Sequence, residues 1–112
     1  MNIYNKAHEL ANEIKNHPEV IEFRKASLKI KDNELSNKML KDFREVQIEA
    51  YTEQMKNGKL TEATEKKLQN MASIISINPE VSSYLQSEQK FAVIWQDIIK
   101  ILNDAVGVDI TI

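Results

Sequence analysis

The residues that break helices are few in this chain, and their positions constrain its fold more than any other feature. Among 112 residues there are two prolines, Pro18 and Pro79, and two glycines, Gly58 and Gly107. They separate stretches whose apolar residues recur three and four positions apart, the spacing that gathers side chains on one face of a helix. Proline is favoured at the first position of a helix, and glycine just after its end. The sequence therefore predicts an all-α fold.

The breakers and the apolar spacing together divide the chain into five expected helices. Asp32-Asn33 is expected as a cap or turn pair before the third helix, Thr61 as the N-cap of the fourth, and Gly58 as the left-handed end of the third. The expected helices cover residues 3–16, 18–31, 34–57, 62–77 and 79–107. Residues 108–112 are rich in β-branched side chains and lack helical spacing, so we expect a short extended tail there. We expect residues 1–107 to form a single helical domain.

The third and fifth helices are too long for a compact monomer of this size. At 1.5 Å per residue they would extend roughly 36 and 42 Å. A domain of about this length has a radius of gyration of only about 13 Å. We therefore expect an elongated bundle of about five helices, two of them long, that associates as a dimer.

The third helix carries more apolar surface than one core face requires. Residues placed 100° apart around its axis put Leu35, Met39, Phe43, Val46 and Ala50 in one arc, which is the expected core stripe. A second apolar arc lies beside it, and the fifth helix shows a similar excess. A chain this short has too little material to cover both, so a second subunit is the expected cover. The predicted dimer interface comprises Leu40, Arg44, Gln47, Ile48, Tyr51, Met55, Phe91, Trp95, Ile98 and Leu102.

Composition excludes several classes of protein. The chain has no cysteine, which removes disulfides, thiolate nucleophiles and cysteine-ligated metal centres. Its longest apolar run, Phe91–Trp95, is far shorter than a membrane span, and its first residues lack the pattern of a signal peptide. We expect a cytoplasmic protein without cofactor or membrane contact. The net charge of −2 argues against binding nucleic acid by bulk electrostatics.

Neither the histidines nor the acidic residues form a recognisable catalytic or metal-binding motif. His8 is expected at the surface or boundary of the first helix, and His17 in a capping or loop role before Pro18. Asp42, Glu45 and Glu49 form a stripe on the third helix that is either a solvated face or a docking surface for a partner protein. We expect no enzymatic activity.

One basic cluster leaves a second function open. It spans the end of the second helix and the start of the third, where the charges could contact RNA or only solubilise the surface. Aromatic residues, which single-stranded nucleic acid binding favours, are absent between Phe23 and Phe43. The cluster comprises Arg24, Lys25, Lys29, Lys31, Lys38 and Lys41.

An ordered set of short segments, covering nearly the whole chain, resembles one known family. The segments are His17-Pro18-Glu19-Val20-Ile21-Glu22-Phe23, Asp42-Phe43-Arg44-Glu45-Val46-Gln47, Gln54-Met55-Lys56-Asn57-Gly58, and Asn78-Pro79-Glu80-Val81 followed by Tyr84, Glu88 and Phe91. In order and spacing they are similar to the YlbF/YmcA/YheA-like family of small helical bacterial proteins, and most of all to its YheA-like branch.

The resemblance implies an all-helical homodimer without known enzymatic activity. Relatives in the YlbF and YmcA branches act in regulatory complexes linked to competence, biofilm formation, sporulation and control of an RNA-degrading endonuclease. Their complex is associated with iron–sulfur clusters held by cysteines, and this chain has none. The expected function is a non-catalytic dimeric adaptor or regulator that binds an unidentified protein. The alternative is an RNA-associated accessory factor.

Overall fold

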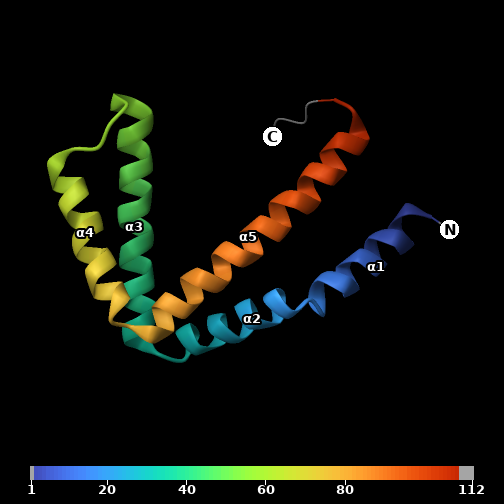
Figure 1. Ribbon diagram of the computed structural model, residues 1–112, viewed down its shortest axis with the longest axis horizontal. Helices are drawn as coiled ribbons and strands as arrows, with labels where there is room; N and C mark the ends of the chain where they lie inside the picture. The colour runs from blue at the N-terminus through green and yellow to red at the C-terminus, as the bar shows by residue number, and fades with distance from the viewer. Residues whose placement is uncertain (1, 109–112) are drawn as a thin grey trace. The chain divides into compact units, whose positions relative to one another are not determined.

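The computed structural model describes residues 2–108, and this part of the chain consists of five α-helices without a β-strand (Figure 1). The helices are α1 (Ile3–Lys15), α2 (Pro18–Lys31), α3 (Glu34–Asn57), α4 (Glu62–Ser76) and α5 (Pro79–Val106). The all-α prediction is therefore confirmed, and the expected helix bounds agree to within one or two residues. Of the predicted tail, only Val108 lies among the described residues.

Side chains that cap the helices explain where several of them begin. In each case a polar side chain accepts a hydrogen bond from the backbone N–H three residues later, which is one of the donors a helix start leaves unsatisfied. The four capping residues are Asn2, Asn33, Thr61 and Asn78. At the end of α3, Gly58 adopts φ 74°, the left-handed conformation that glycine was expected to supply. Asn33 is thus the capping member of the expected Asp32-Asn33 pair, and the predicted cap at Thr61 is confirmed.

The chain divides into two compact units. Unit 1 contains Met1–Lys25 and Leu85–Ile112, and unit 2 contains Ala26–Tyr84. Both α2 and α5 continue from one unit into the other. The single domain expected over residues 1–107 stays a prediction.

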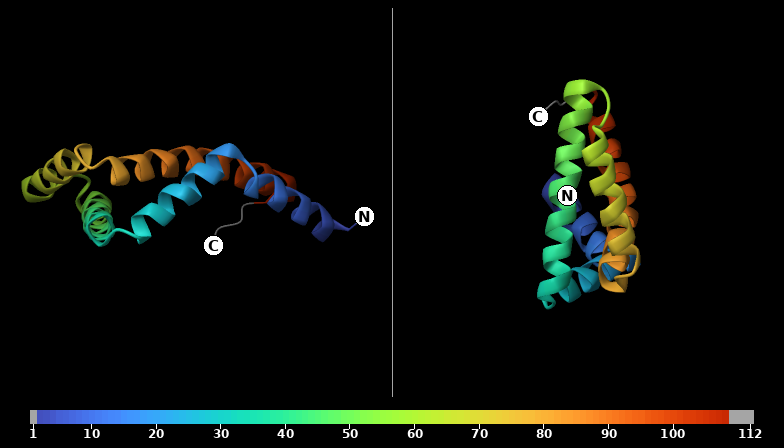
Figure 2. Two further views of the ribbon diagram at one scale, coloured as in Figure 1. Left: turned by 90° about the horizontal axis from the view of Figure 1, so that it is seen from below. Right: turned by 90° about the vertical axis from the view of Figure 1, so that its left-hand side faces the viewer.

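Unit 2 is built around the α3–α4 hairpin, whose two helices lie side by side in opposite directions (Figures 1 and 2). All of the described residues that are buried belong to this unit. They are Ile30, Ser36, Thr64, Ile75 and Val81. The core among the described residues therefore lies in unit 2.

Unit 1 contains α1, the first part of α2 and most of α5. Phe23 of α2 stacks on Phe91 of α5 at a ring-centroid distance of 5.2 Å, and Phe91 stacks in turn on Trp95 at 5.8 Å. None of the described residues of unit 1 is fully buried. Packing in this unit thus rests on partly exposed aromatic rings.

The core stripe predicted for α3 is wrong at one position. Met39, Phe43, Val46 and Ala50 are half-buried, but Leu35 is 68% exposed. The buried residue in the first turn of α3 is its neighbour Ser36, which lies about 100° further around the helix axis. The packed side of α3 is therefore rotated away from Leu35 at this end.

Candidate functional site

The strongest candidate for a functional surface is the second apolar arc of α3, which we call the outer α3 face and which comprises Leu40, Arg44, Gln47, Ile48, Tyr51 and Met55. Leu40 and Arg44 are half-buried, and Gln47 is exposed. Ile48, Tyr51 and Met55 are 66%, 68% and 70% exposed. Large apolar side chains grouped in this way typically mark a surface that binds another protein.

The geometry of the outer α3 face suits a second helix. Its residues 44, 48, 51 and 55 are four, three and four positions apart, which is the spacing of the contact seam in paired helices. The guanidinium Nη1 of Arg44 donates a hydrogen bond to Oε1 of Gln47 at 3.0 Å. Arg44 therefore adds a polar group to the end of an otherwise apolar seam, and Gln47 holds its guanidinium there.

The remaining residues of the predicted dimer interface lie on α5, within unit 1. Phe91 and Ile98 are half-buried, whereas Trp95 and Leu102 are about half exposed. The ten predicted residues are therefore distributed over both units, six on α3 and four on α5. Within each unit they leave apolar surface open to solvent.

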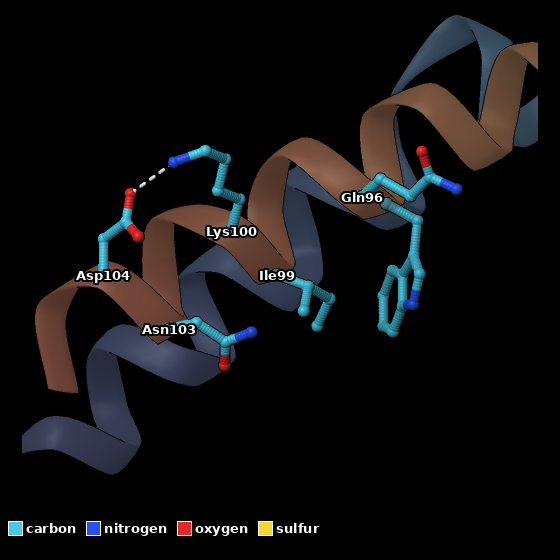
Figure 3. A pocket seen from close by; sticks show the side chains of 6 residues that line it. Gln96, Ile99, Lys100, Asn103 and Asp104 are labelled. Atoms are coloured by element: carbon cyan, nitrogen blue, oxygen red, sulfur yellow. Dashed lines mark hydrogen bonds and ion pairs between the residues drawn. The ribbon is translucent and has the colours of Figure 1, made fainter. Parts of the chain in front are cut away.

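Polar and apolar groups alternate along the exposed side of α5. An open hollow of about 430 Å³ is lined by Trp95, Gln96, Ile99, Lys100, Asn103 and Asp104. In Figure 3, Ile99 and Asn103 lie on one edge of the helix, while Lys100 and Asp104 form an ion pair of 2.7 Å on the other. A hollow formed by a single helix suits contact with another surface rather than enclosure of a small molecule.

A second hollow, of about 310 Å³, lies along α1. Six residues of α1 and one of α5 line it, and most of its lining is apolar: Ile3, Lys6, Ala7, Leu10, Ala11, Ile14 and Leu102. We call it the α1–α5 groove. The α1 residues that line it recur at helical spacing in the sequence, but the spacing does not reveal that they are exposed.

The acidic stripe proposed as a docking surface is partly neutralised in the structure. Asp42 forms an ion pair with Lys38 at 3.0 Å, and Glu49 forms one with Lys67 of α4 at 3.2 Å. Glu45 is exposed and has no hydrogen bond or ion pair to another described residue. The stripe thus presents less negative charge than its sequence suggests.

The basic cluster is exposed throughout but is not gathered on one face. Arg24 and Lys25 belong to unit 1, and the other four residues to unit 2. At 100° per residue, Lys25 and Lys29 lie close to each other on α2, about a third of a turn from Arg24 and Lys31. Arg24 is also engaged, since its Nη2 donates a hydrogen bond to the backbone carbonyl of Lys15 at 3.2 Å.

The two histidines occupy the positions expected from the sequence. His8 is exposed on α1. His17 lies before α2, where its Nδ1 accepts a hydrogen bond from the backbone N–H of Glu19 at 3.2 Å and its carbonyl oxygen accepts those of Val20 and Ile21. Its capping role is confirmed. Within residues 2–108, no three His, Asp or Glu side chains are grouped closely enough to hold a metal ion.

The most extensive polar cluster of unit 2 was not predicted. The carboxylate of Glu53 on α3 accepts hydrogen bonds from the backbone N–H of Thr61 at 2.9 Å and from the hydroxyl of Thr64 at 2.5 Å. The Thr61 hydroxyl in turn donates to Oγ1 of Thr64 at 3.1 Å. The hydrogen bonds from Thr61 and Thr64 lower the pKa of Glu53. The cluster joins the start of α4 to α3, so its role is to hold the hairpin closed.

None of the helices in the described part of the chain has the combination of length and apolar character that crossing a membrane requires.

Comparison with known proteins places the chain in a family. A family model described as control of competence regulator ComK, YlbF/YmcA, matches residues 3–107. A UPF0342 protein of Clostridium tetani is 58% identical over 99% of this chain and 96% of its own length. Similar proteins of Clostridium novyi and Halothermothrix orenii are 51% and 34% identical over 97% and 99% of this chain, and over 96% and 94% of their own lengths. The chain therefore belongs to the YlbF/YmcA family, as the resemblance in its sequence predicted.

Proposed function

We propose that this protein is a non-catalytic regulatory adaptor of the bacterial cytoplasm, which acts as a homodimer and binds another protein through its long helical faces. The family description, control of a competence regulator, supports a regulatory role. No small-molecule chemistry is needed for such a role. The polar clusters of unit 2 support this view, because Glu53, Thr64 and Glu49 are occupied in holding α4 against α3.

The observation that carries the proposal is the exposure of the outer α3 face. Ile48, Tyr51 and Met55 each leave about two thirds of their surface in water, on one stripe of a helix that also packs against α4. Exposed apolar clusters of this kind are uncommon on monomers unless another molecule covers them. Together with Phe91, Trp95, Ile98 and Leu102 on α5, this face forms the proposed dimer interface.

The proposed docking surface for a partner protein lies on a different side of α3. In the proposal, Asp42, Glu45 and Glu49 form its docking surface, with Glu45 as the residue whose charge is not paired within the described chain. Charged residues at the rim of an interface mainly raise the rate of association. Their contribution should therefore be greatest at low salt.

The proposal is tested by placing charge on the outer α3 face. Ile48→Asp combined with Tyr51→Asp should convert the dimer to monomer, measured by light scattering, because two carboxylates cannot be buried unpaired at an apolar contact. Lys56→Glu is the matched control, since it changes the net charge equally and lies between Glu45 and Glu49 on the acidic side of the same helix. The control should remain dimeric with the same helix content.

Two results would contradict the proposal. An Ile48→Asp/Tyr51→Asp variant that is still dimeric and captures the same partner as the control would show that the outer α3 face is not used. Retention on RNA that weakens steeply with added salt, and that Lys29→Glu with Lys31→Glu abolishes, would instead favour the RNA-associated role.

A further inference from the structure

The described residues of unit 1 do not include the buried core that a stable helical unit needs. Every described residue of α1 except Ile14 is exposed, including the apolar Ile3 and Leu10. The aromatic stack runs from Phe23 of α2 through Phe91 to Trp95 of α5, and Trp95 is 46% exposed. Helices in proteins gain most of their stability from packing an apolar face. The described residues of unit 1 do not provide that packing.

The uncovered side chains form a continuous apolar surface rather than scattered points. At 100° per residue, Leu10, Ile3, Ile14 and Ala7 fall within an arc of about 60° on α1. The same construction on α5 places Leu102 within about 20° of Trp95. Leu102 also lines the α1–α5 groove together with the α1 residues. The groove and the exposed stripe of α5 therefore belong to one surface.

Because α1 is short, it needs a packing partner that is always present. A helix of 13 residues is marginal in water when isolated. A partner that bound only at certain times would leave α1 without apolar packing whenever it dissociated. A second copy of the chain, by contrast, is present whenever the protein is made.

Much of the area that a stable dimer needs is exposed on this one surface. A stable interface takes about 800 Å² from each partner. With about 200 Å² for each large side chain and the exposed fractions of these residues, the six large side chains that share the surface leave on the order of 600 Å² open. The exposed Ala7 and Ala11 of the groove add to this area. The six are Ile3, Leu10, Trp95, Ile99, Leu102 and Val106.

The charges around this surface also favour a second copy. On α1 two lysines, Lys6 and Lys15, balance Glu9 and Glu13, and from Lys90 to Asp104 α5 likewise carries two lysines and two aspartates. Two such mixed surfaces can meet without repulsion between like charges. An anionic membrane would require a basic border along the apolar stripe, and α1 has no net positive charge.

We propose that a second copy of this chain covers the α1–α5 groove, so that the groove of each copy packs against that of the other and unit 1 acquires its core only in the dimer. The inference rests on the proposed homodimeric function and adds α1 to its interface. Contact of each patch with its own counterpart is the arrangement expected of a two-fold dimer.

The experiment places two charges in the groove. Leu10→Asp combined with Ile14→Asp should raise the dissociation constant of the dimer at least tenfold in sedimentation equilibrium. The same change should remove the protection of α1 amides from hydrogen exchange, while the amides of α3 and α4 stay protected. Asn5→Asp combined with Asn12→Asp adds the same charge on the opposite side of α1, and should leave both measurements unchanged.

Three outcomes would overturn this inference. One is a Leu10→Asp/Ile14→Asp variant with the dissociation constant of the control. Another is a monomeric wild-type chain. The third is wild-type binding to phosphatidylserine vesicles that the same variant abolishes, which would assign the α1 stripe to a membrane. Because the proposed function is tested on α3, a dimer that depends on Ile48 and Tyr51 but not on Leu10 and Ile14 would refute only the role of α1.

Discussion

Glu53 shows how a single carboxylate joins two helices. It lies on α3, yet its hydrogen bonds go to Thr61 and Thr64 at the start of α4. Thr61 caps α4 through its hydroxyl, so the N–H that it donates to Glu53 ties the capping residue itself to α3. Hydrogen bonds to an ionised acceptor are stronger than those between neutral groups. The hairpin should therefore respond to the ionisation of this one residue.

Acid should destabilise the α3–α4 hairpin through Glu53. Since hydrogen bonds lower its pKa in the folded state, its contribution is complete at pH values above the unfolded-state pKa and is lost as the pH falls through the folded-state pKa. Glu53→Gln should thus lower the urea midpoint at neutral pH, and the difference from wild type should shrink in acid. Glu45→Gln, at an exposed position without a described partner, is the control and should change the midpoint little at either pH. Equal midpoints for Glu53→Gln and wild type at neutral pH would refute this role.

Single residues also show where prediction from the sequence stops. His17 was predictable because its role depends on Pro18 and Glu19 beside it. Glu53 was not, because it looks like one more acid of a solvated stripe until a turn brings Thr61 and Thr64 against it. Leu35 was misplaced because an ideal helical wheel does not reveal which side of the first turn of α3 packs. The burial of Ser36 decides that question.

At the scale of the helices, the ends were more predictable than the surfaces. Capping side chains, prolines and glycines act on the backbone within about four residues, so their effect can be read from local sequence. Which apolar stripe is covered depends on other helices that are distant in sequence. The apolar residues of α1 recur at helical spacing, and this spacing does not reveal that the described residues of unit 1 leave them exposed.

Gly58 sets the end of α3 and the direction of the turn into α4. Its φ of 74° is accessible to glycine at little cost, and its N–H donates to the carbonyl oxygen of Gln54 at 3.0 Å. The side-chain amide of Gln54 returns a hydrogen bond to the carbonyl of Gly58 at 2.9 Å. Both backbone polar groups of Gly58 are thus hydrogen bonded to Gln54, and these two bonds hold the turn.

Replacing this glycine should weaken the hairpin by a defined amount. Gly58→Ala should destabilise the protein by about 1 kcal/mol, because a β-carbon disfavours the left-handed conformation. Gly58→Asn should cost less, since asparagine tolerates that conformation better. Thermal unfolding followed by circular dichroism measures both, with Lys59→Ala as the neighbouring control. A wild-type melting temperature for Gly58→Ala would show that the turn adopts another conformation.

At the scale of the whole molecule, the two units differ in how much they bury. The described residues of unit 2 include five that are buried, and those of unit 1 include none. In a stable homodimer, such a difference is removed when the subunits cover each other's apolar faces. Association of two subunits should then change the solvent exposure of unit 1 more than that of unit 2.

The single tryptophan offers a direct measurement of this behaviour. Trp95 lies in unit 1 at the exposed end of the aromatic stack. Diluting the protein from micromolar to low nanomolar concentration should shift its emission to longer wavelength and increase quenching by acrylamide, because dissociation exposes the indole to water. The Leu10→Asp/Ile14→Asp variant should show the shifted emission at all concentrations. Wild-type emission that does not change on dilution would argue against Trp95 in a dissociating interface.

The order of the two units along the chain has a consequence for synthesis. Unit 1 joins Met1–Lys25 to Leu85–Ile112, and the whole of unit 2 lies between them. At about 5–20 residues per second, the last turn of α5 leaves the ribosome roughly 4 to 16 s after the residues of α2 that it accompanies in unit 1. The α3–α4 hairpin can close as soon as Thr64 follows Glu53, whereas Phe23 has to wait for Phe91. Throughout that interval the nascent chain displays Phe23 without the ring on which it stacks, and transiently exposed apolar surface of this kind favours aggregation.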